Sequence, residues 1–255
     1  MRRLDIARRR LGDWLGGGTP GGGDSPLAGA TPEDAAILEH AAPFTMTSFE
    51  RLQANIDAVR YCLRRGVPGA IVECGVWRGG SVLAMILALQ EFGVDDREVF
   101  LYDTFEGMTE PTEADVSTVS GSALNAWNDA AGRNERMQSE LFAEDIYDVD
   151  SVRETVLSSG YPAERVHLVQ GDVMETIPAV APSEIALLRL DTDWHASTAH
   201  ELEHLYPRIQ AAGVLIIDDY GHWDGARRAV DDYFADQPPI LLHRTDYTGR
   251  IGIKA

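Results

Sequence analysis

Positive charge is scarce in this sequence, and lysine is almost missing from it. Among 255 residues, Lys and Arg total 22 against 41 Asp and Glu, so the formal net charge is −19. Lys254 is the single lysine. A surface with this charge repels phosphate groups at long range, which excludes a protein that coats duplex nucleic acid and argues against docking on anionic lipid. We therefore expect no nucleic-acid partner and no membrane partner.

Cysteines and long apolar runs are equally sparse. The two cysteines, Cys62 and Cys74, are too few for a disulfide framework or a four-thiolate zinc site, and they form no CxxC pair. No stretch reaches the ~18 apolar residues that span a bilayer, and residues 1–15 lack the apolar core of a secretory signal. These absences predict a reducing, cytoplasmic location.

The composition is that of an ordinary globular protein, with 44% hydrophobic and 25% charged residues. The length suits one α/β domain, which we place at residues 31–255. Residues 1–30 carry five Arg and three Asp and include a glycine-rich stretch from Gly16 to Gly23. This pattern predicts a short basic helix followed by a flexible segment.

Short apolar runs alternate with helical segments along most of the chain. Expected strands cover residues 70–74, 99–103, 166–170, 185–191 and 214–218, and a closing hairpin joins 240–243 to 250–253. Expected helices follow the Thr31 cap and cover residues 48–65, 81–92, 197–209 and 227–234. Because the strands are apolar on both faces, the pattern indicates a mostly parallel, seven-stranded sheet with helices on both sides and a C-terminal antiparallel hairpin. Ligands of such sheets bind at the carboxyl ends of the strands.

One long connection interrupts this alternation. Residues 107–150 are polar and acidic, and they separate the second expected strand from the next helix. A connection of this length inside a compact domain is typical of a lid or a binding loop. We expect it to cover the acceptor side of a site, with solvated padding as the alternative.

The first three strand ends carry residues that suit an adenosyl ligand. Gly75, Gly79 and Gly80 form a glycine turn that lets a ligand approach the backbone and the following helix. Asp103 ends the second strand, where a carboxylate can accept both hydroxyls of a ribose. Asp172 follows the third strand and can accept an exocyclic amine of adenine. The alternative is that these residues form helix caps and turns.

Carboxylates also follow the fourth and fifth strands. Asp191 and Asp193 follow one, and Asp218 and Asp219 follow the other. Neighbouring strands lie ~5 Å apart, so these carboxylates would repel each other strongly. A hard divalent cation with oxygen ligands relieves that repulsion, and Mg²⁺ is the natural ion. The alternative, helix capping, is expected to hold for Asp193.

The histidines give a weaker signal. His200-Glu201-Leu202-Glu203-His204 matches the HExxH pattern of zinc peptidases, but Pro207 stands where the longer pattern has glycine and no third ligand is evident. We interpret this stretch as an exposed helix face. His195 and His222 lie beside the aspartate cluster and are the two histidines that merit attention.

Several motifs in this order resemble one known family. They are Met46-Thr47-Ser48 with Glu50-Arg51, Glu73-Cys74-Gly75-Val76-Trp77-Arg78-Gly79-Gly80, Asp103 with Phe105-Glu106-Gly107, Leu188-Arg189-Leu190-Asp191, Ser197-Thr198, Leu205-Tyr206-Pro207, Asp218-Asp219-Tyr220-Gly221 and Ala229-Val230-Asp231-Asp232-Tyr233. From about residue 44 to 235, the chain resembles the TylF/MycF family of Mg²⁺-dependent macrolide-sugar O-methyltransferases.

The resemblance implies a class I methyltransferase fold, Rossmann-like, that binds S-adenosylmethionine. The cofactor-binding residues it implies are Thr45, Met46, Thr47, Glu73, Cys74, Gly75, Val76, Trp77, Ser81, Asp103, Thr104, Phe105, Gly107, Asp172 and Asp191. It also implies that Asp191, Asp218 and Asp219 bind Mg²⁺ and that Asp191 is the general base. The expected acceptor is a hydroxyl of a deoxysugar on a glycosylated small molecule, and we expect a homodimer or higher homo-oligomer.

The expected mechanism follows from charge. A metal that holds two vicinal hydroxyls acidifies one of them and fixes its position, and Asp191 then accepts the proton. The sequence departs from the family pattern at Trp194-His195, at Gly171-Asp172-Val173 and over residues 115–144. Two alternatives stay open, namely a metal-dependent glycosyltransferase that uses Asp191 and Asp193 as a DxD motif, and a non-catalytic protein that binds an adenosyl ligand.

Overall fold

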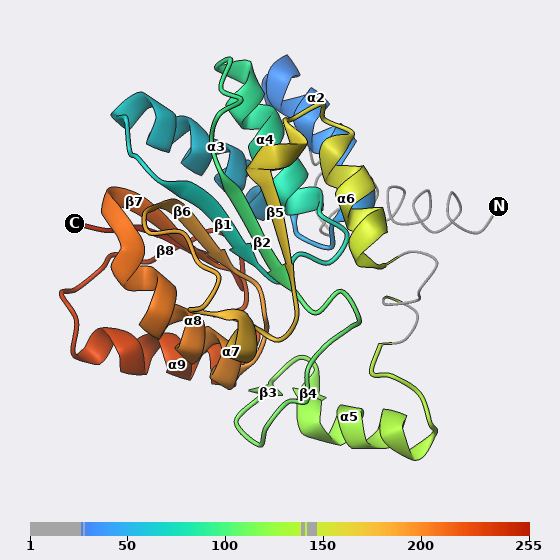
Figure 1. The fold of residues 1–255 in the computed structure, drawn as a ribbon. Coiled ribbons are helices and arrows are strands. Elements are labelled where there is room, and N and C mark those ends of the chain that lie inside the picture. The colour runs from blue at the N-terminus through green and yellow to red at the C-terminus, as the bar shows by residue number, and fades with distance from the viewer. Residues whose placement is uncertain (1–26, 28, 139–140, 142–146) are drawn as a thin grey trace.

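The computed structural model describes residues 27, 29–138, 141 and 147–255 (Figure 1). The basic helix and flexible segment expected over residues 1–30 lie almost wholly outside these residues. Within the described ranges, no helix combines the length and the apolar character needed to cross a membrane.

A seven-stranded sheet forms the centre of the molecule, with the strand order β5-β2-β1-β6-β7-β9-β8. The first five strands in this order are parallel, and β9 is antiparallel to both β7 and β8. The strands are β1 (Ala70–Cys74), β2 (Val99–Asp103), β5 (Val166–Gln170), β6 (Ile185–Leu190), β7 (Ile209–Ile217), β8 (His243–Arg244) and β9 (Arg250–Ile253). This confirms the mostly parallel sheet with a closing antiparallel hairpin, although β8 starts at His243, where the strand expected over residues 240–243 ends.

Two groups of helices cover the two faces of the sheet (Figure 1). Alternate strand residues point to opposite faces, so Ile71 packs in one apolar cluster and Val72 in the other. The face of Ile71 is covered by α2 (Pro32–Ala41), α3 (Phe49–Arg65), α4 (Gly80–Glu91) and α6 (Val149–Leu157). The face of Val72 is covered by α7 (Val173–Thr176), α8 (His195–Leu205) and α9 (Asp224–Ala235).

Helix α3 has the bounds that the sequence predicts, and its direction matters for the site. Ser48 caps its start by accepting a hydrogen bond from the backbone N–H of Arg51 (3.2 Å), and Gly66 ends it in the left-handed region at φ 65°. Cys62 near its end donates to the carbonyl of Ala186 at the start of β6 (3.3 Å). The helix therefore runs antiparallel to β6 and presents its N-terminal end at the carboxyl edge of the sheet.

The helix expected over residues 197–209 is wrong at both ends. Helix α8 begins at His195 and ends at Leu205, a 3₁₀ turn covers Tyr206–Arg208, and β7 begins at Ile209. Pro207 lacks a backbone N–H and its ring crowds the preceding turn, so the α-helix cannot continue through it.

The described part of the connection over residues 107–150 is folded against the domain. It contains a short hairpin of β3 (Val116–Ser117) and β4 (Gly121–Ser122), followed by α5 (Ala123–Gly132), and it projects beyond the carboxyl edge of the sheet (Figure 1). Its Ala123, Ala130 and Met137 share a small apolar cluster with Trp194, Trp223 and Ala226 of the domain. The connection is therefore more than solvated padding.

A buried carboxylate also anchors this connection. The Asp115 side chain is fully buried and accepts hydrogen bonds from the backbone N–H of His195 (2.8 Å) and from that of Thr112 (2.7 Å). Since His195 is the first residue of α8, Asp115 supplies a carboxylate to the positive end of that helix. Gly225 of α9 packs directly against the same carboxylate, where a Cβ would overlap an oxygen of Asp115.

We expect Gly225→Ala to destabilise the protein because the added methyl group has no room beside Asp115. Overpacking of this kind costs roughly 1–3 kcal/mol. The matched control is Gly132→Ala in α5, where a Cβ meets nothing within 4 Å and alanine favours the helix. Urea denaturation of both variants measures the difference, and equal stability of the two would contradict the close packing of α9 on Asp115.

Candidate active site

A cavity of about 440 Å³ opens at the carboxyl edge of the sheet, where the sequence places its candidate ligand residues. The predicted site residues in its lining are Thr45, Met46, Thr47, Gly75, Val76, Trp77, Ser81, Asp103, Thr104, Gly107, Asp172, Asp191, Asp218 and Asp219. They come from the ends of five neighbouring parallel strands and from the segment before α3. The cavity therefore joins residues that are as far apart in the sequence as Thr45 and Asp219.

Three predicted cofactor residues have other surroundings. Cys74 is fully buried in the apolar cluster below α8 and α9, because its strand position points it to that face. Phe105 is buried in the opposite cluster, and Glu73 is fully buried and accepts a hydrogen bond from Arg189 (2.6 Å). None of the three lines the cavity, so a direct contact between their side chains and a cofactor stays a prediction.

The glycine turn after β1 is held by Asp103. One carboxylate oxygen of Asp103 accepts from the backbone N–H of Val76 (2.7 Å) and of Trp77 (3.0 Å). The other oxygen accepts from the backbone N–H of Phe105 (2.9 Å) and from the hydroxyl of Tyr147. Asp103 thus shapes the turn in addition to facing the cavity, and its contact with a ribose stays a prediction.

Asp172 caps the start of α7 and also lines the cavity. Its carboxylate accepts from the backbone N–H of Met174 (2.9 Å) at the start of α7, which is the capping role that the sequence left open as an alternative. It also lines the cavity, so the expected contact with adenine stays a prediction.

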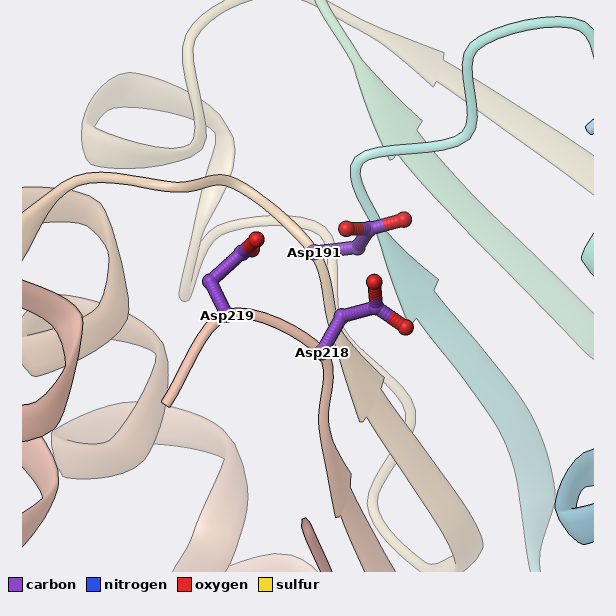
Figure 2. A group of neighbouring side chains, drawn as sticks. All are labelled: Asp191, Asp218 and Asp219. Carbon is purple, nitrogen blue, oxygen red and sulfur yellow. The ribbon is translucent and has the colours of Figure 1, made fainter. Parts of the chain in front are cut away.

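Asp191, Asp218 and Asp219 come together from the adjacent ends of β6 and β7 and gather round one space (Figure 2). One oxygen from each lies within 4.8 Å of the others. Burial raises the pKa of Asp191 and of Asp219 well above the usual value, and the neighbouring carboxylates raise both further. This donor set consists only of carboxylate oxygens in a crowded negative site, which fits a hard divalent cation such as Mg²⁺.

Two arginines partly neutralise these carboxylates. Arg189 is buried and its guanidinium contacts Glu73 (2.6 Å), Asp191 (2.7 Å) and Asp218 (2.5 Å). From the start of α3, Arg51 pairs with Asp218. The sequence reading gave neither arginine a role, although a signal was there. A charged residue inside the apolar run Leu187-Leu188-Arg189-Leu190 must be paired when its strand is buried.

Asp193 does not cap α8, so that expectation is wrong. The residue adopts the left-handed region at φ 65°, and its carboxylate accepts from the indole N–H of Trp223 (2.8 Å). The first N–H of α8 bonds instead to Asp115. Burial raises the pKa of Asp193 to about 7. Because its oxygens are not among the three converging carboxylates, the geometry does not support Asp191 and Asp193 as a two-aspartate metal motif.

His195 and His222 differ in their relation to the cavity. His222 lines it, and its ring nitrogens lie 3.0 Å from the hydroxyl of Ser120 and 3.0 Å from that of Tyr247. Burial and the nearby charge of Arg51 lower the pKa of His222. His195 does not line the cavity, and its backbone N–H bonds to Asp115.

The HExxH stretch is not the exposed helix face that the sequence suggested, because only Glu203 of its five residues is exposed. His200 bonds to the carbonyl of Ile177 (2.9 Å), and Glu201 is fully buried, where it accepts from the hydroxyl of Thr192 (3.0 and 3.1 Å). Glu201 therefore steadies the turn that follows Asp191. Burial raises the pKa of Glu201 to about 8 from the usual 4.5.

The raised pKa of Glu201 predicts a pH dependence of stability. Between pH 4.5 and about 8 the folded protein keeps the proton on Glu201, whereas the unfolded chain has lost it. The contribution of this proton to the free energy of unfolding is therefore complete below pH 4.5 and is lost as the pH rises through 8. In Glu201→Gln, which cannot ionise, the free energy of unfolding should fall less steeply with pH over this window. Between the two pKa values, the free energy of unfolding of the wild type should fall by about 1.4 kcal/mol more per pH unit than that of the variant.

Urea denaturation at a series of pH values from 5 to 8.5 measures this slope. The control is Glu203→Gln, which changes an exposed glutamate on the same helix and should keep the wild-type slope. Identical slopes for wild type and Glu201→Gln would show that Glu201 is ionised at little cost in the folded protein.

Comparisons with known proteins identify the family of this chain. The model of the macrocin-O-methyltransferase family (TylF) matches residues 33–249. A tetracenomycin-sugar 4'-O-methyltransferase of Streptomyces olivaceus is 35% identical over 193 residues, which cover 74% of this chain and 67% of that protein. The mycinamicin III 3''-O-methyltransferase of Micromonospora griseorubida is 31% identical over 201 residues, covering 79% and 72%.

A solved structure has the same fold. The O-methyltransferase NovP superposes with a TM-score of 0.69 at 24% identity, over 99% of this chain and 99% of that chain. Together with the glycine turn and the aspartates at the strand ends, the family match shows that the chain belongs to the macrocin O-methyltransferase family and is an S-adenosylmethionine-dependent O-methyltransferase.

Proposed function

We propose that this enzyme methylates a hydroxyl of a deoxysugar attached to a secondary metabolite, with Mg²⁺ held by Asp191, Asp218 and Asp219. The observation that carries the proposal is the convergence of these three carboxylates in the wall of the cavity that also contains the glycine turn. A cofactor on the turn and a sugar at the carboxylates would then meet in one cavity.

The names of the relatives support a sugar acceptor. The enzymes of S. olivaceus and M. griseorubida are named for methylation at positions 4' and 3'' of glycosylated compounds. A third relative, from Streptomyces niveus, is a demethyldecarbamoylnovobiocin O-methyltransferase that is 30% identical over 191 residues. All three act on small molecules of antibiotic type, which favours the same class of acceptor here.

In the proposed mechanism Asp191 has two tasks. When bound, Mg²⁺ supplies Lewis acidity that makes a nearby sugar hydroxyl easier to deprotonate. Arg189 pairs with one oxygen of Asp191 and fixes the direction of the carboxylate. The side chain of Asp191 is 28% exposed and so reaches the cavity. Asp191 accepts the hydroxyl proton as the oxygen attacks the sulfonium methyl group, the S–CH₃ bond breaks and S-adenosylhomocysteine leaves.

Because Asp103 holds the glycine turn, its substitution is expected to weaken the binding of the cofactor product. S-adenosylhomocysteine should raise the melting temperature of the wild type by mass action. In Asp103→Asn an amide NH₂ replaces one oxygen and opposes backbone N–H groups, so the turn should loosen and the shift should shrink. A tenfold loss of affinity corresponds to about 1.4 kcal/mol.

Differential scanning fluorimetry over a range of S-adenosylhomocysteine concentrations measures the shift. Asp96→Asn, at an exposed position outside the cavity, should behave as the wild type. Equal shifts in wild type and Asp103→Asn would remove Asp103 from the cofactor site.

Asp191→Asn tests the metal and base roles. Asparagine keeps an oxygen for the metal but cannot accept the proton, so turnover should fall by about 10²–10⁴-fold while the affinity for S-adenosylhomocysteine changes little. In Asp218→Asn and Asp219→Asn the metal affinity is weakened, so raised Mg²⁺ should partly restore turnover.

The measurement is turnover of each variant on a rhamnoside acceptor across a Mg²⁺ titration. EDTA should abolish turnover of the wild type. Full activity in EDTA, or an Asp191→Asn enzyme near the wild-type rate, would refute the proposed roles of the three aspartates.

A further inference from the structure

A second cavity lies next to the proposed active site, between the 107–150 connection and the start of α9. Its volume is about 390 Å³, within the range of small-molecule sites. Three residues, Gln138, Asp193 and His222, line both cavities. The two spaces are therefore adjoining parts of one larger site, with the converging aspartates in the first part only.

Hydrogen bonds hold two of the shared side chains, those of Asp193 and His222, in place. Asp193 accepts from the indole N–H of Trp223 (2.8 Å), and Trp223 itself lines the second cavity. His222 lies 3.0 Å from the hydroxyl of Ser120 in the connection and 3.0 Å from that of Tyr247. The boundary between the two cavities therefore consists of side chains fixed by hydrogen bonds, and one of these bonds links the connection to the domain.

One wall of the second cavity is apolar, although most of the residues that line the cavity are polar. Ala123, Ala126 and Ala130 are spaced i, i+3 and i+7 on α5, so they share one face of the helix and project only methyl groups into the cavity. Met137 and Trp223 add apolar surface. A wall of small apolar side chains leaves room for the face of a ring and offers it apolar contact.

The rim of the second cavity is polar. Arg133, Glu135 and Arg136 lie there, and Arg133 pairs with Glu135 (2.8 Å). With Ser120, Gln138, Asp193 and His222, these residues offer hydrogen-bond donors and acceptors opposite the apolar wall, and such polar groups fix the orientation of small organic molecules in their sites. The first cavity has to hold both the cofactor and the sugar, which leaves the second cavity for whatever the sugar is attached to.

We propose that the second cavity binds the aglycone of the acceptor, a ring system with one apolar face and several polar substituents. This inference rests on the proposed function, because it places the attached sugar in the first cavity beside Asp191. Contacts of the aglycone with α5 then hold the sugar in position, so binding remote from the reacting hydroxyl supports the reaction. Ala126 is a specificity-determining position because a larger side chain there would fill part of the cavity beside the alanine face of α5.

The test compares two acceptors that differ only in the aglycone, methyl α-L-rhamnoside and 4-methylumbelliferyl α-L-rhamnoside. Wild type should prefer the aryl glycoside in kcat/KM by about tenfold or more, through KM. Ala126→Leu should abolish most of this preference. The control Ala131→Leu makes the same change at an exposed position of α5 that lines neither cavity, and it should keep the wild-type ratio.

A binding measurement separates this inference from the proposed function. Fluorescence titration of 4-methylumbelliferone alone, with S-adenosylhomocysteine present, should show saturable binding that Ala126→Leu weakens about tenfold and Ala131→Leu leaves unchanged. If neither glycoside is methylated but this difference is seen, the proposed function fails and the aglycone cavity stands. If the ratio of kcat/KM and the binding of 4-methylumbelliferone are the same in wild type and Ala126→Leu, the aglycone cavity is refuted.

Discussion

The guanidinium of Arg189 holds together the strand ends on which the site depends. It lies on β6, between β1 and β7, and contacts Glu73, Asp191 and Asp218 while donating to the hydroxyl of Thr47 (3.1 Å). An unpaired buried charge costs several kcal/mol, so each of these groups needs the others. One side chain therefore fixes three neighbouring strands and the segment before α3 relative to each other, and with them the floor of the cavity.

The same network leaves the site with excess negative charge. Arg189 and Arg51 provide two positive charges, whereas Glu73, Asp191, Asp218 and Asp219 provide four negative ones when ionised. Burial, only partly offset by Arg189, raises the pKa of Glu73 to about 7. Added positive charge stabilises such a site, and protons and the proposed Mg²⁺ would compete to supply it. If Mg²⁺ binds as proposed, its affinity should therefore depend on pH.

The local pattern of apolar residues and turn signals in the sequence predicts the strands well. It predicts contacts between distant parts of the chain poorly. The strands at residues 70–74, 99–103 and 166–170 have the expected bounds because each is a short apolar run between turn signals. The meeting of Asp191 with Asp218 and Asp219 also follows from topology, since β6 and β7 are neighbours. The error at Asp193 has a different origin. Whether an aspartate caps a helix depends on which other group reaches that N–H, and here Asp115 does so from 80 residues earlier in the chain.

The two sides of the active site obey different physical constraints. Asp191, Asp218 and Asp219 are set by strand ends and by a buried charge network, so a change at any of them disturbs the others. The connection meets the domain through the Asp115 anchor, a small apolar cluster and hydrogen bonds at His222. Exposed positions of α5 such as Ala126 take no part in these contacts. Substitutions at such positions of α5 are therefore expected to leave the geometry of the three aspartates unchanged, which would let the proposed acceptor preference vary independently of them.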